Sequence, residues 1–285
     1  MVEPKVHDYV IRVRDVQVTY PGGTRALRGA SIDFQRGQFT VLLGMSGAGK
    51  STLLRTLNHL APPTGGQVMS PDLGALGDNA VLRLHRRRTA MVFQQHQLIG
   101  RHTALDNVLT GRLAYHSTWR SLFPLPKGDM ELALHCLDRV GLADKALARA
   151  DQLSGGQQQR VGIARALAQQ PNLILADEPV ASLDPATSEK VLTLLRTICA
   201  EDGISAVVSL HQLEYALRFA DRIVGLADAR IVFDGTPAEL QEEQLGRIYA
   251  GHRMQPGQGT PHASSAIDAA PFIPRLMNAP LEMTP

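Results

Sequence analysis

The stretch GMSGAGKS, from Gly44 to Ser51, decides the fold of this chain. It fits the spacing G-x-x-x-x-G-K-[ST], in which glycines let backbone N–H groups close around phosphate oxygens. The apolar run TVLLG precedes it and the helical pattern TLLRTLNHL follows it, so the loop joins a strand to a helix. The N-terminus of that helix adds partial positive charge. The sequence therefore predicts a site for nucleotide phosphates at this loop.

The residue types in the loop suit the binding of ATP with Mg²⁺. Lys50 neutralises phosphate charge, and the hydroxyl of Ser51 can ligate the metal. The other positions supply backbone N–H groups or begin the helix, and they are Gly44, Ser46, Gly47, Ala48, Gly49 and Thr52.

Two carboxylates end a second apolar strand, NLILAD. Asp177 is placed to hold Mg²⁺, directly or through water. Glu178 is placed to orient and deprotonate an attacking water molecule. Paired carboxylates at a strand end can also be a solvated edge. The phosphate loop, expected on a neighbouring strand of the same sheet, favours the catalytic interpretation.

A second glycine turn opens another helix, in the stretch DQLSGGQQQR from Asp151 to Arg160. Its free N–H groups and dipole suit an anion, as those of the first loop do. One ATP does not need two such helices from one chain. In a symmetric homodimer, however, the turn formed by Ser154, Gly155, Gly156 and Gln157 can cap the γ-phosphate that the other copy holds. We therefore expect two copies that close around two ATP molecules, with each nucleotide held between the copies. After hydrolysis, the two copies should separate.

The alternation of apolar strands and amphipathic helices predicts an α/β fold with a mostly parallel core sheet. The stretch RIVGLADARIVFDG predicts a final hairpin. We expect a nucleotide-binding domain over residues 1–250, with a helical subdomain at about 95–165. Residues 251–285 are rich in Pro, Ala, Ser and Met and lack periodicity, so we expect a flexible tail.

Composition excludes several classes of function. A net charge of +2 over 285 residues gives no strong attraction to nucleic acid. The basic tract from Leu82 to Ala90 lacks interleaved aromatic residues, so we expect a solvated face rather than a nucleic-acid site. Cys136 and Cys199 are expected as buried apolar residues in a reducing compartment. No signal peptide is predicted, and no apolar run approaches the ~20 residues of a membrane helix. A role at a membrane therefore requires a partner.

The motif LSGGQ, with the Lys50 loop before it and LILADEP after it, resembles the ATPase subunits of ABC transporters. The resemblance covers about Ile11 to Ala250. It implies an ABC-type P-loop NTPase with a mostly parallel core sheet, an N-terminal antiparallel β subdomain and an inserted α-helical subdomain. It also implies an active ATPase.

The family's other motifs match this chain one position at a time. Tyr20 matches the aromatic residue that stacks on adenine, and Gln94 matches the glutamine that joins metal and water to the membrane-facing subdomain. The loop from Ser182 to Asp184 matches the one that touches the other protomer. His211 matches the histidine that contacts the γ-phosphate, although a lone histidine at a strand end is more often structural. Met45 departs from the family, which often has Pro there.

The resemblance leaves three alternatives: an importer, an export or lipid-handling complex, and a soluble ABC protein of DNA repair or translation. A separate cassette without a coiled-coil insertion favours the importer. The stretches VFQQHQLIGRHTALDNVLTG, LADEPVASLDP and VSLHQ are similar to ATPase subunits of phosphonate importers, whose relatives serve phosphite and hypophosphite. This implies two transmembrane permease subunits, a periplasmic binding protein and a peripheral position at the cytoplasmic face of the inner membrane. An importer of another small solute remains open.

The segment from Leu109 to Asp129 has two interpretations. Its apolar residues Tyr115, Trp119, Leu122 and Phe123 can belong to the core of the helical subdomain. They can also form a surface that receives a helix of the membrane subunit, where Trp and Arg anchors are favoured.

Overall fold

The computed structural model describes residues 8–94, 97–117, 119 and 125–249. Contacts divide the chain into residues 1–252 and residues 253–285. The predicted tail lies outside the described residues, as do Leu122 and Phe123.

A six-stranded sheet forms the centre, in the order β10-β9-β3-β8-β7-β6. Its strands are β3 (Phe39–Leu43), β6 (Thr89–Val92), β7 (Leu173–Asp177), β8 (Ser205–Leu210), β9 (Arg222–Ala227) and β10 (Arg230–Gly235). All neighbours pair in parallel except β10, which runs antiparallel to β9 in the predicted hairpin. The mostly parallel core sheet is therefore confirmed. The expectation that NLILAD neighbours the strand of the phosphate loop was wrong, because β8 lies between β3 and β7.

A second, four-stranded antiparallel sheet has the order β2-β1-β4-β5. It consists of β1 (Tyr9–Thr19), β2 (Arg25–Gln35), β4 (Gly65–Ser70) and β5 (Gly74–Ala75). The alternation of IRVRDVQVTY is that of a half-buried strand, and its valines face the core. The N-terminal antiparallel β subdomain is therefore confirmed.

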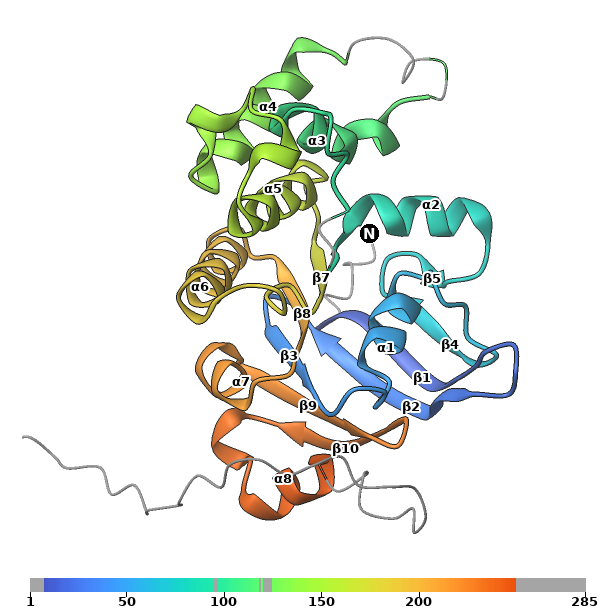
Figure 1. The fold of residues 1–285 in the computed structure, drawn as a ribbon. Coiled ribbons are helices and arrows are strands. Elements are labelled where there is room, and N and C mark those ends of the chain that lie inside the picture. The colour runs from blue at the N-terminus through green and yellow to red at the C-terminus, as the bar shows by residue number, and fades with distance from the viewer. Residues whose placement is uncertain (1–7, 95–96, 118, 120–124, 250–285) are drawn as a thin grey trace, which may run out of the picture. The chain divides into compact units, whose positions relative to one another are not determined.

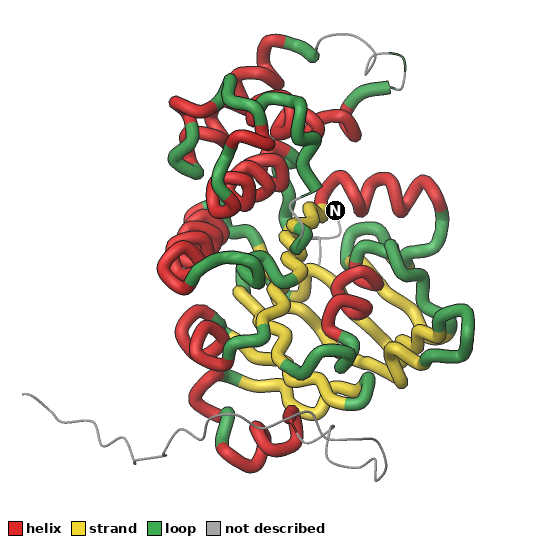
Figure 2. Tube along the Cα trace, viewed as in Figure 1, coloured by secondary structure: helices red, strands yellow, loops and turns green. Residues whose placement is uncertain are grey.

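The helices are α1 (Lys50–Leu57), α2 (Asn79–Arg88), α3 (Ala104–Leu109), α4 (Lys127–Arg139), α5 (Gly155–Ala168), α6 (Pro185–Glu201), α7 (Leu213–Phe219) and α8 (Glu242–Tyr249). The described residues also form the 3₁₀ turns η1 (Thr110–Tyr115), η3 (Ala143–Lys145), η4 (Ala150–Gln152) and η5 (Pro237–Glu239). Figure 1 shows α3, α4 and α5 gathered at one end of the core sheet, and Figure 2 shows this group as helices joined by loops. None of the described helices is long and apolar enough to cross a membrane.

The core sheet is buried on both faces. Val41 and Leu43 of β3 face α4 to α7, whereas Leu42 faces α1 and the antiparallel sheet. Cys136 and Cys199 are free and lie in the first of these two clusters, as expected for buried apolar residues. Burial raises the pKa of Cys136 to about 11 and that of Cys199 to about 12.

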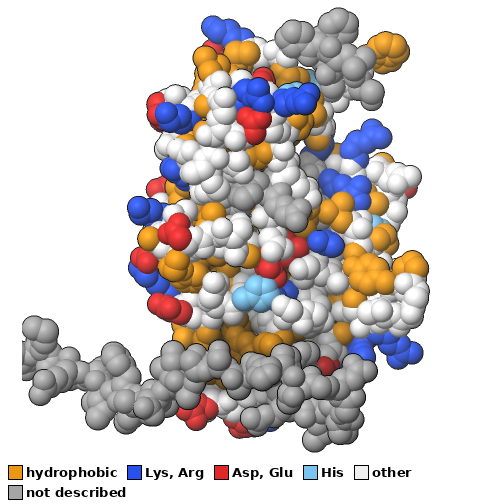
Figure 3. Space-filling model, viewed as in Figure 1, with side chains coloured by type: hydrophobic (Ala, Val, Ile, Leu, Met, Phe, Trp, Pro, Cys, Tyr) orange, Lys and Arg blue, Asp and Glu red, His pale blue; other side chains and the backbone are white. Residues whose placement is uncertain are grey.

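The basic tract forms most of α2, and Figure 3 shows Lys and Arg side chains gathered over this helix. Two residues of the tract, His85 and Arg86, hold α2 against the end of α1. Arg86 donates to the backbone carbonyls of Asn58 and His59, and the His85 ring lies 2.8 Å from the carbonyl of Leu57. Burial lowers the pKa of His85.

Candidate functional site

The predicted site residues meet at one edge of the core sheet, where its parallel strands end. The phosphate loop follows β3, His211 follows β8, Asp177 ends β7 and Gln94 lies two residues beyond β6. Ligand sites of open α/β sheets form at this edge. The strand order β3-β8-β7-β6 brings together residues that lie far apart in the sequence.

Two glycines let the phosphate loop lie tightly against the neighbouring backbone. Gly44 has φ +155°, and a Cβ atom there would lie 2.4 Å from the carbonyl oxygen of Leu226 in β9. Gly49 has φ +107°, and its Cβ would lie 2.7 Å from the carbonyl oxygen of Ala26 in β2. A larger residue at either position would displace the backbone, so the loop conformation requires glycine.

Lys50 folds back over its own loop. Its ammonium donates to the carbonyl of Gly44 at 2.7 Å and to that of Met45 at 3.1 Å. The residue is only 4% exposed. Burial lowers the pKa of Lys50, while Glu178 and Asp177 oppose this effect. The loop therefore surrounds a cation held close to two carboxylates.

Asp177 is the most connected group of the site. Its Oδ1 accepts from Ser51 Oγ at 2.7 Å and from Ser209 Oγ at 3.0 Å, while Arg55 lies 3.7 Å from Oδ2. Asp177 thus ties α1 to β7 and β8. Sequence reasoning missed Ser209 and Arg55. Arg55 stands one helical turn after Ser51, a spacing that could have indicated it.

Glu178 and His211 form a pair across the ends of β7 and β8. The two side chains approach to 2.6 Å between Glu178 Oε1 and His211 Nε2. Glu178 has φ +49°, which is uncommon outside glycine, and its backbone N–H donates to Ser209 Oγ at 2.9 Å. The sharp turn after Asp177 directs the Glu178 carboxylate toward His211.

Tyr20 lies beside the phosphate loop, where its hydroxyl is 3.4 Å from Thr52 Oγ1. The side chain is 39% exposed. It belongs to the turn between β1 and β2 and leaves aromatic surface open next to the loop.

The second glycine turn caps α5. Ser154 Oγ accepts from the N–H of Gln157 at 3.4 Å, and the Gln157 side chain accepts from the N–H of Ser154 at 2.9 Å. In Figure 1, α5 lies among α3, α4 and α6 and away from α1, which carries the phosphate loop. One copy of the chain therefore holds its two glycine turns at separate places.

Asp184 caps α6 by accepting from the N–H of Thr187 at 3.0 Å, and its hydrogen bonds to Thr187 lower the pKa of Asp184. The first turn of α5 packs on this region. A Cβ built at Gly155 would lie 3.4 Å from Cδ2 of Leu183, and one at Gly156 only 2.4 Å from Cγ2 of Thr187.

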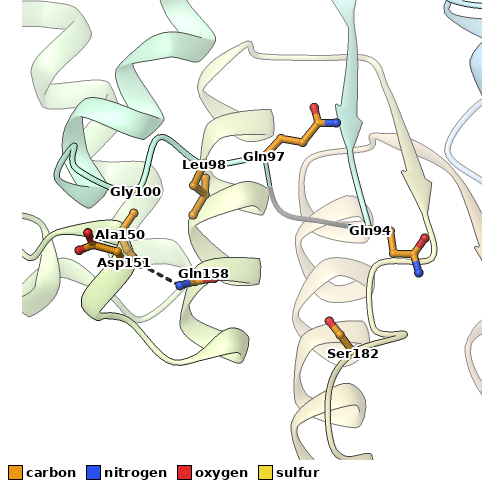
Figure 4. Close-up of a pocket in the computed structure, with 8 residues that line it drawn as sticks. All are labelled: Gln94, Gln97, Leu98, Gly100, Ala150, Asp151, Gln158 and Ser182. Atoms are coloured by element: carbon orange, nitrogen blue, oxygen red, sulfur yellow. Dashed lines mark hydrogen bonds between the residues drawn. The ribbon is translucent and has the colours of Figure 1, made fainter.

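Gln94 lines a cavity of about 550 Å³, which Figure 4 shows. The cavity connects the end of β6 with Ser182 and with the first turns of α5. Its lining consists of Gln94, Gln97, Leu98, Gly100, Ala150, Asp151, Gln158 and Ser182. Gln158 is fixed there by donating to the carbonyls of Ala150 and Leu153.

Tyr115 belongs to the packing of the helical region. The guanidinium groups of Arg87 and Arg112 lie 4.3 and 3.9 Å from the centre of its ring. Its hydroxyl donates to the carbonyl of Gln169, just after the end of α5. Arg112 also pairs with the buried carboxylate of Asp129, and this pair and His116 lower the pKa of Asp129 against the effect of its burial. Trp119, in contrast, is 79% exposed. The segment from Leu109 to Asp129 therefore contains both packed and exposed aromatic residues.

The tight fit at Gly156 gives a prediction about stability. Gly156→Ala should lower the free energy of unfolding by about 1–3 kcal/mol, because the new methyl group overlaps Cγ2 of Thr187. Gly155→Ala, the matched control, should have a smaller effect. Adding Thr187→Ser removes Cγ2 and should restore most of the loss, as measured by urea denaturation. Equal effects of the two glycine substitutions would contradict this packing.

Comparison with known proteins identifies the family to which this chain belongs. The sequence pattern of the ABC transporter family matches residues 27–181, more than half of the chain. The phosphite import ATP-binding protein PxtA of Stutzerimonas stutzeri is 71% identical over 251 residues, which cover 88% of this chain and 91% of that protein. The phosphonates import ATP-binding protein PhnC 3 of Nostoc sp. is 64% identical over 240 residues, covering 84% and 92%.

Solved structures share the fold. The protein cbiO1 from Clostridium perfringens, part of the ABC transporter complex cbiONQ, has a TM-score of 0.73 and 27% identity over 85% of this chain and 94% of its own. A dimeric ATP-binding cassette in a post-hydrolysis state, bound to ADP and Pi, has a TM-score of 0.69 and 36% identity over 80% of this chain and 98% of its own. The chain therefore belongs to the ABC transporter family, and within it to the subunits that bind and hydrolyse ATP to drive import.

Proposed function

We propose that this chain powers an importer for phosphonate or a related reduced-phosphorus anion such as phosphite or hypophosphite. The observation that carries the proposal is the meeting of the phosphate loop, Asp177 and the Glu178–His211 pair at one sheet edge. The relatives support the class of transported anion. This chain is 71% identical to a phosphite import protein and 64% identical to a phosphonates import protein.

ATP binds across the phosphate loop. The backbone N–H groups from Gly44 to Thr52 and the N-terminus of α1 hold the phosphates, and Lys50 neutralises part of their charge. The exposed ring of Tyr20 stacks on the adenine, an interaction that contributes about 1–3 kcal/mol.

The donor set fits Mg²⁺. Ser51 Oγ and the Asp177 carboxylate are hard oxygen ligands 2.7 Å apart, and the amide oxygen of Gln94 comes from the end of β6. Among the described residues, no three His, Cys, Asp or Glu side chains form a metal-binding group. Such a sparse protein shell suits Mg²⁺, which takes one or two carboxylates and completes its shell with phosphate and water oxygens. When bound, the metal neutralises charge on the phosphates.

Glu178 acts as the general base. Its carboxylate takes a proton from the water that attacks the γ-phosphorus, and the bond to the β-phosphate oxygen breaks to leave ADP and phosphate. His211 lies 2.6 Å from this carboxylate, so it orients the base. The match of His211 to the family's histidine supports a contact of His211 with the γ-phosphate as well. Ser209 contributes by fixing both Asp177 and the backbone of Glu178.

Two copies of the chain complete each site. The turn from Ser154 to Gln157 of one copy caps the γ-phosphate held by the other copy, and the loop from Ser182 to Asp184 touches the partner. The separation of α5 from α1 within one copy supports this arrangement. Loss of the γ-phosphate on hydrolysis then lets the halves part.

The cavity next to Gln94 suits contact with the membrane subunits. Two permease subunits bind at this helical end, so that the homodimer lies on the cytoplasmic face of the inner membrane, and a periplasmic binding protein selects the anion. The exposed Trp119, in the chain between η1 and α4, offers an aromatic anchor for such a contact. Residues 1–250 form the nucleotide-binding domain, with a helical subdomain at about 95–165 and a tail over 251–285.

The base assignment predicts the behaviour of Glu178→Gln. This variant should bind ATP, lose about 10²- to 10⁴-fold in turnover and accumulate as a closed dimer, because the amide cannot accept the proton. ATP turnover and light scattering measure the two effects. Glu189→Gln, at an exposed carboxylate of α6 that pairs with Arg218, is the matched control and should keep normal turnover. Normal turnover of Glu178→Gln would show that another group is the base.

The cargo assignment predicts a growth phenotype. A strain that lacks this gene and redundant importers should grow on phosphate but fail on at least one of 2-aminoethylphosphonate, methylphosphonate, phosphite and hypophosphite as sole phosphorus source. The wild-type gene should rescue growth, and a gene with Glu178→Gln should not. Normal growth on all five sources would remove the reduced-phosphorus cargo and leave the ATPase assignment unaffected, as expected for an importer of another solute or an export complex.

A further inference from the structure

Gln159 is a buried amide without hydrogen-bond partners. It lies in the second turn of α5 and is 0% exposed. In the part of the chain that the structure describes, it is the one residue whose side-chain nitrogen and oxygen are both buried and unpartnered. Burying an amide in this way costs free energy of folding, so such groups call for a physical explanation.

Its neighbour Gln158 shows what a satisfied amide looks like in the same helix. Gln158 Nε2 donates to the carbonyl of Ala150 at 2.9 Å and to that of Leu153 at 3.1 Å. An apolar side chain would fill the position of Gln159 at a lower cost. The amide of Gln159 is therefore unfavourable in the conformation that the structure shows.

Helical spacing places Gln159 on the face of α5 that meets the 180–187 region. Gly155 and Gly156, four and three residues earlier, lie on this face and approach Leu183 and Thr187, respectively. The helix begins with the turn that caps the partner's nucleotide. The region opposite contains the loop that touches the partner. Helical spacing thus puts Gln159 on the face of α5 that starts at the capping turn and is directed at the segment with the Ser182–Asp184 loop.

We propose that Gln159 is a positioning residue whose amide forms hydrogen bonds with the backbone of residues 179–184 when the ATP-bound dimer closes. A small shift of α5 against this segment brings the amide within reach of its carbonyl and N–H groups. The unpaired amide raises the free energy of the open form, and its pairing stabilises the closed form. Gln159 thereby couples the Ser154–Gln157 turn to the Ser182–Asp184 loop. This inference rests on the proposed function.

The first measurement is the thermal stability of the full chain without nucleotide. Gln159→Met keeps the length of the side chain and removes both polar atoms, so the melting temperature should rise by a few degrees. Gln158→Met is the matched control, and it should lower the melting temperature because two hydrogen bonds are lost. A fall for Gln159→Met as well would show that the amide is already satisfied in the open chain, for example by an ordered water, and would overturn the proposal.

The second measurement is closure of the dimer by ATP, followed by light scattering in chains that carry Glu178→Gln. Adding Gln159→Met should raise the ATP concentration at half-closure about tenfold, the size expected for the loss of one or two net hydrogen bonds. ATP affinity of the monomer should not change. A purely structural role would leave the half-closure point where it was, and this result would also overturn the proposal.

These experiments distinguish an error about Gln159 from an error about the two-copy site. If Glu178→Gln dimerises with ATP and Gln159→Met does not affect closure, only the role of Gln159 is wrong. If Glu178→Gln itself does not dimerise, the proposed two-copy site is wrong and the role of Gln159 falls with it.

Discussion

The rest of the candidate site depends on the hydrogen bonds that the buried carboxylate of Asp177 accepts. A carboxylate that is 4% exposed is costly unless it is hydrogen-bonded, and here two hydroxyl groups donate to one of its oxygens. These donors come from α1 and β8, so the first turn of the phosphate-loop helix is fixed against two strands. Arg55 adds a longer ion pair from the same helix. In the proposed function, the groups that hold metal and phosphate and the general base are therefore positioned before any ligand binds, which favours electrostatic catalysis.

A second constraint is the separation of the two glycine turns. The phosphate loop belongs to the core sheet, whereas the Ser154–Gln157 turn belongs to the helical group of α3, α4 and α5. In the proposed function, two copies bring the N–H groups of both turns to the same nucleotide, so that hydrolysis changes the contact between two molecules. We propose that this change reaches a membrane partner through the cavity beside Gln94.

The sequence predicted where the candidate residues lie, because their position depends on chain order and local pattern. Apolar runs precede the phosphate loop, Asp177, Glu178 and His211, and parallel strands bring the ends of these runs together. The order of the strands could not be read in the same way, because crossover connections decide it, and β8 was not expected between β3 and β7. Ser209 was missed because a serine within an apolar run carries no distinct signal. The contacts of Tyr115 with Arg87 and Arg112 join distant segments, and no local pattern reports them.

A mixing experiment tests whether each nucleotide site is shared by two copies of the chain. Lys50→Ala disables the phosphate loop and Gly155→Asp places a negative charge at the capping turn, so each variant alone should be inactive. In a mixed dimer one site carries both defects and the other carries none. The mixture should therefore regain ATP turnover that neither variant has alone. If the mixture stays inactive at every ratio, each chain completes its own site and the nucleotide sites are not shared.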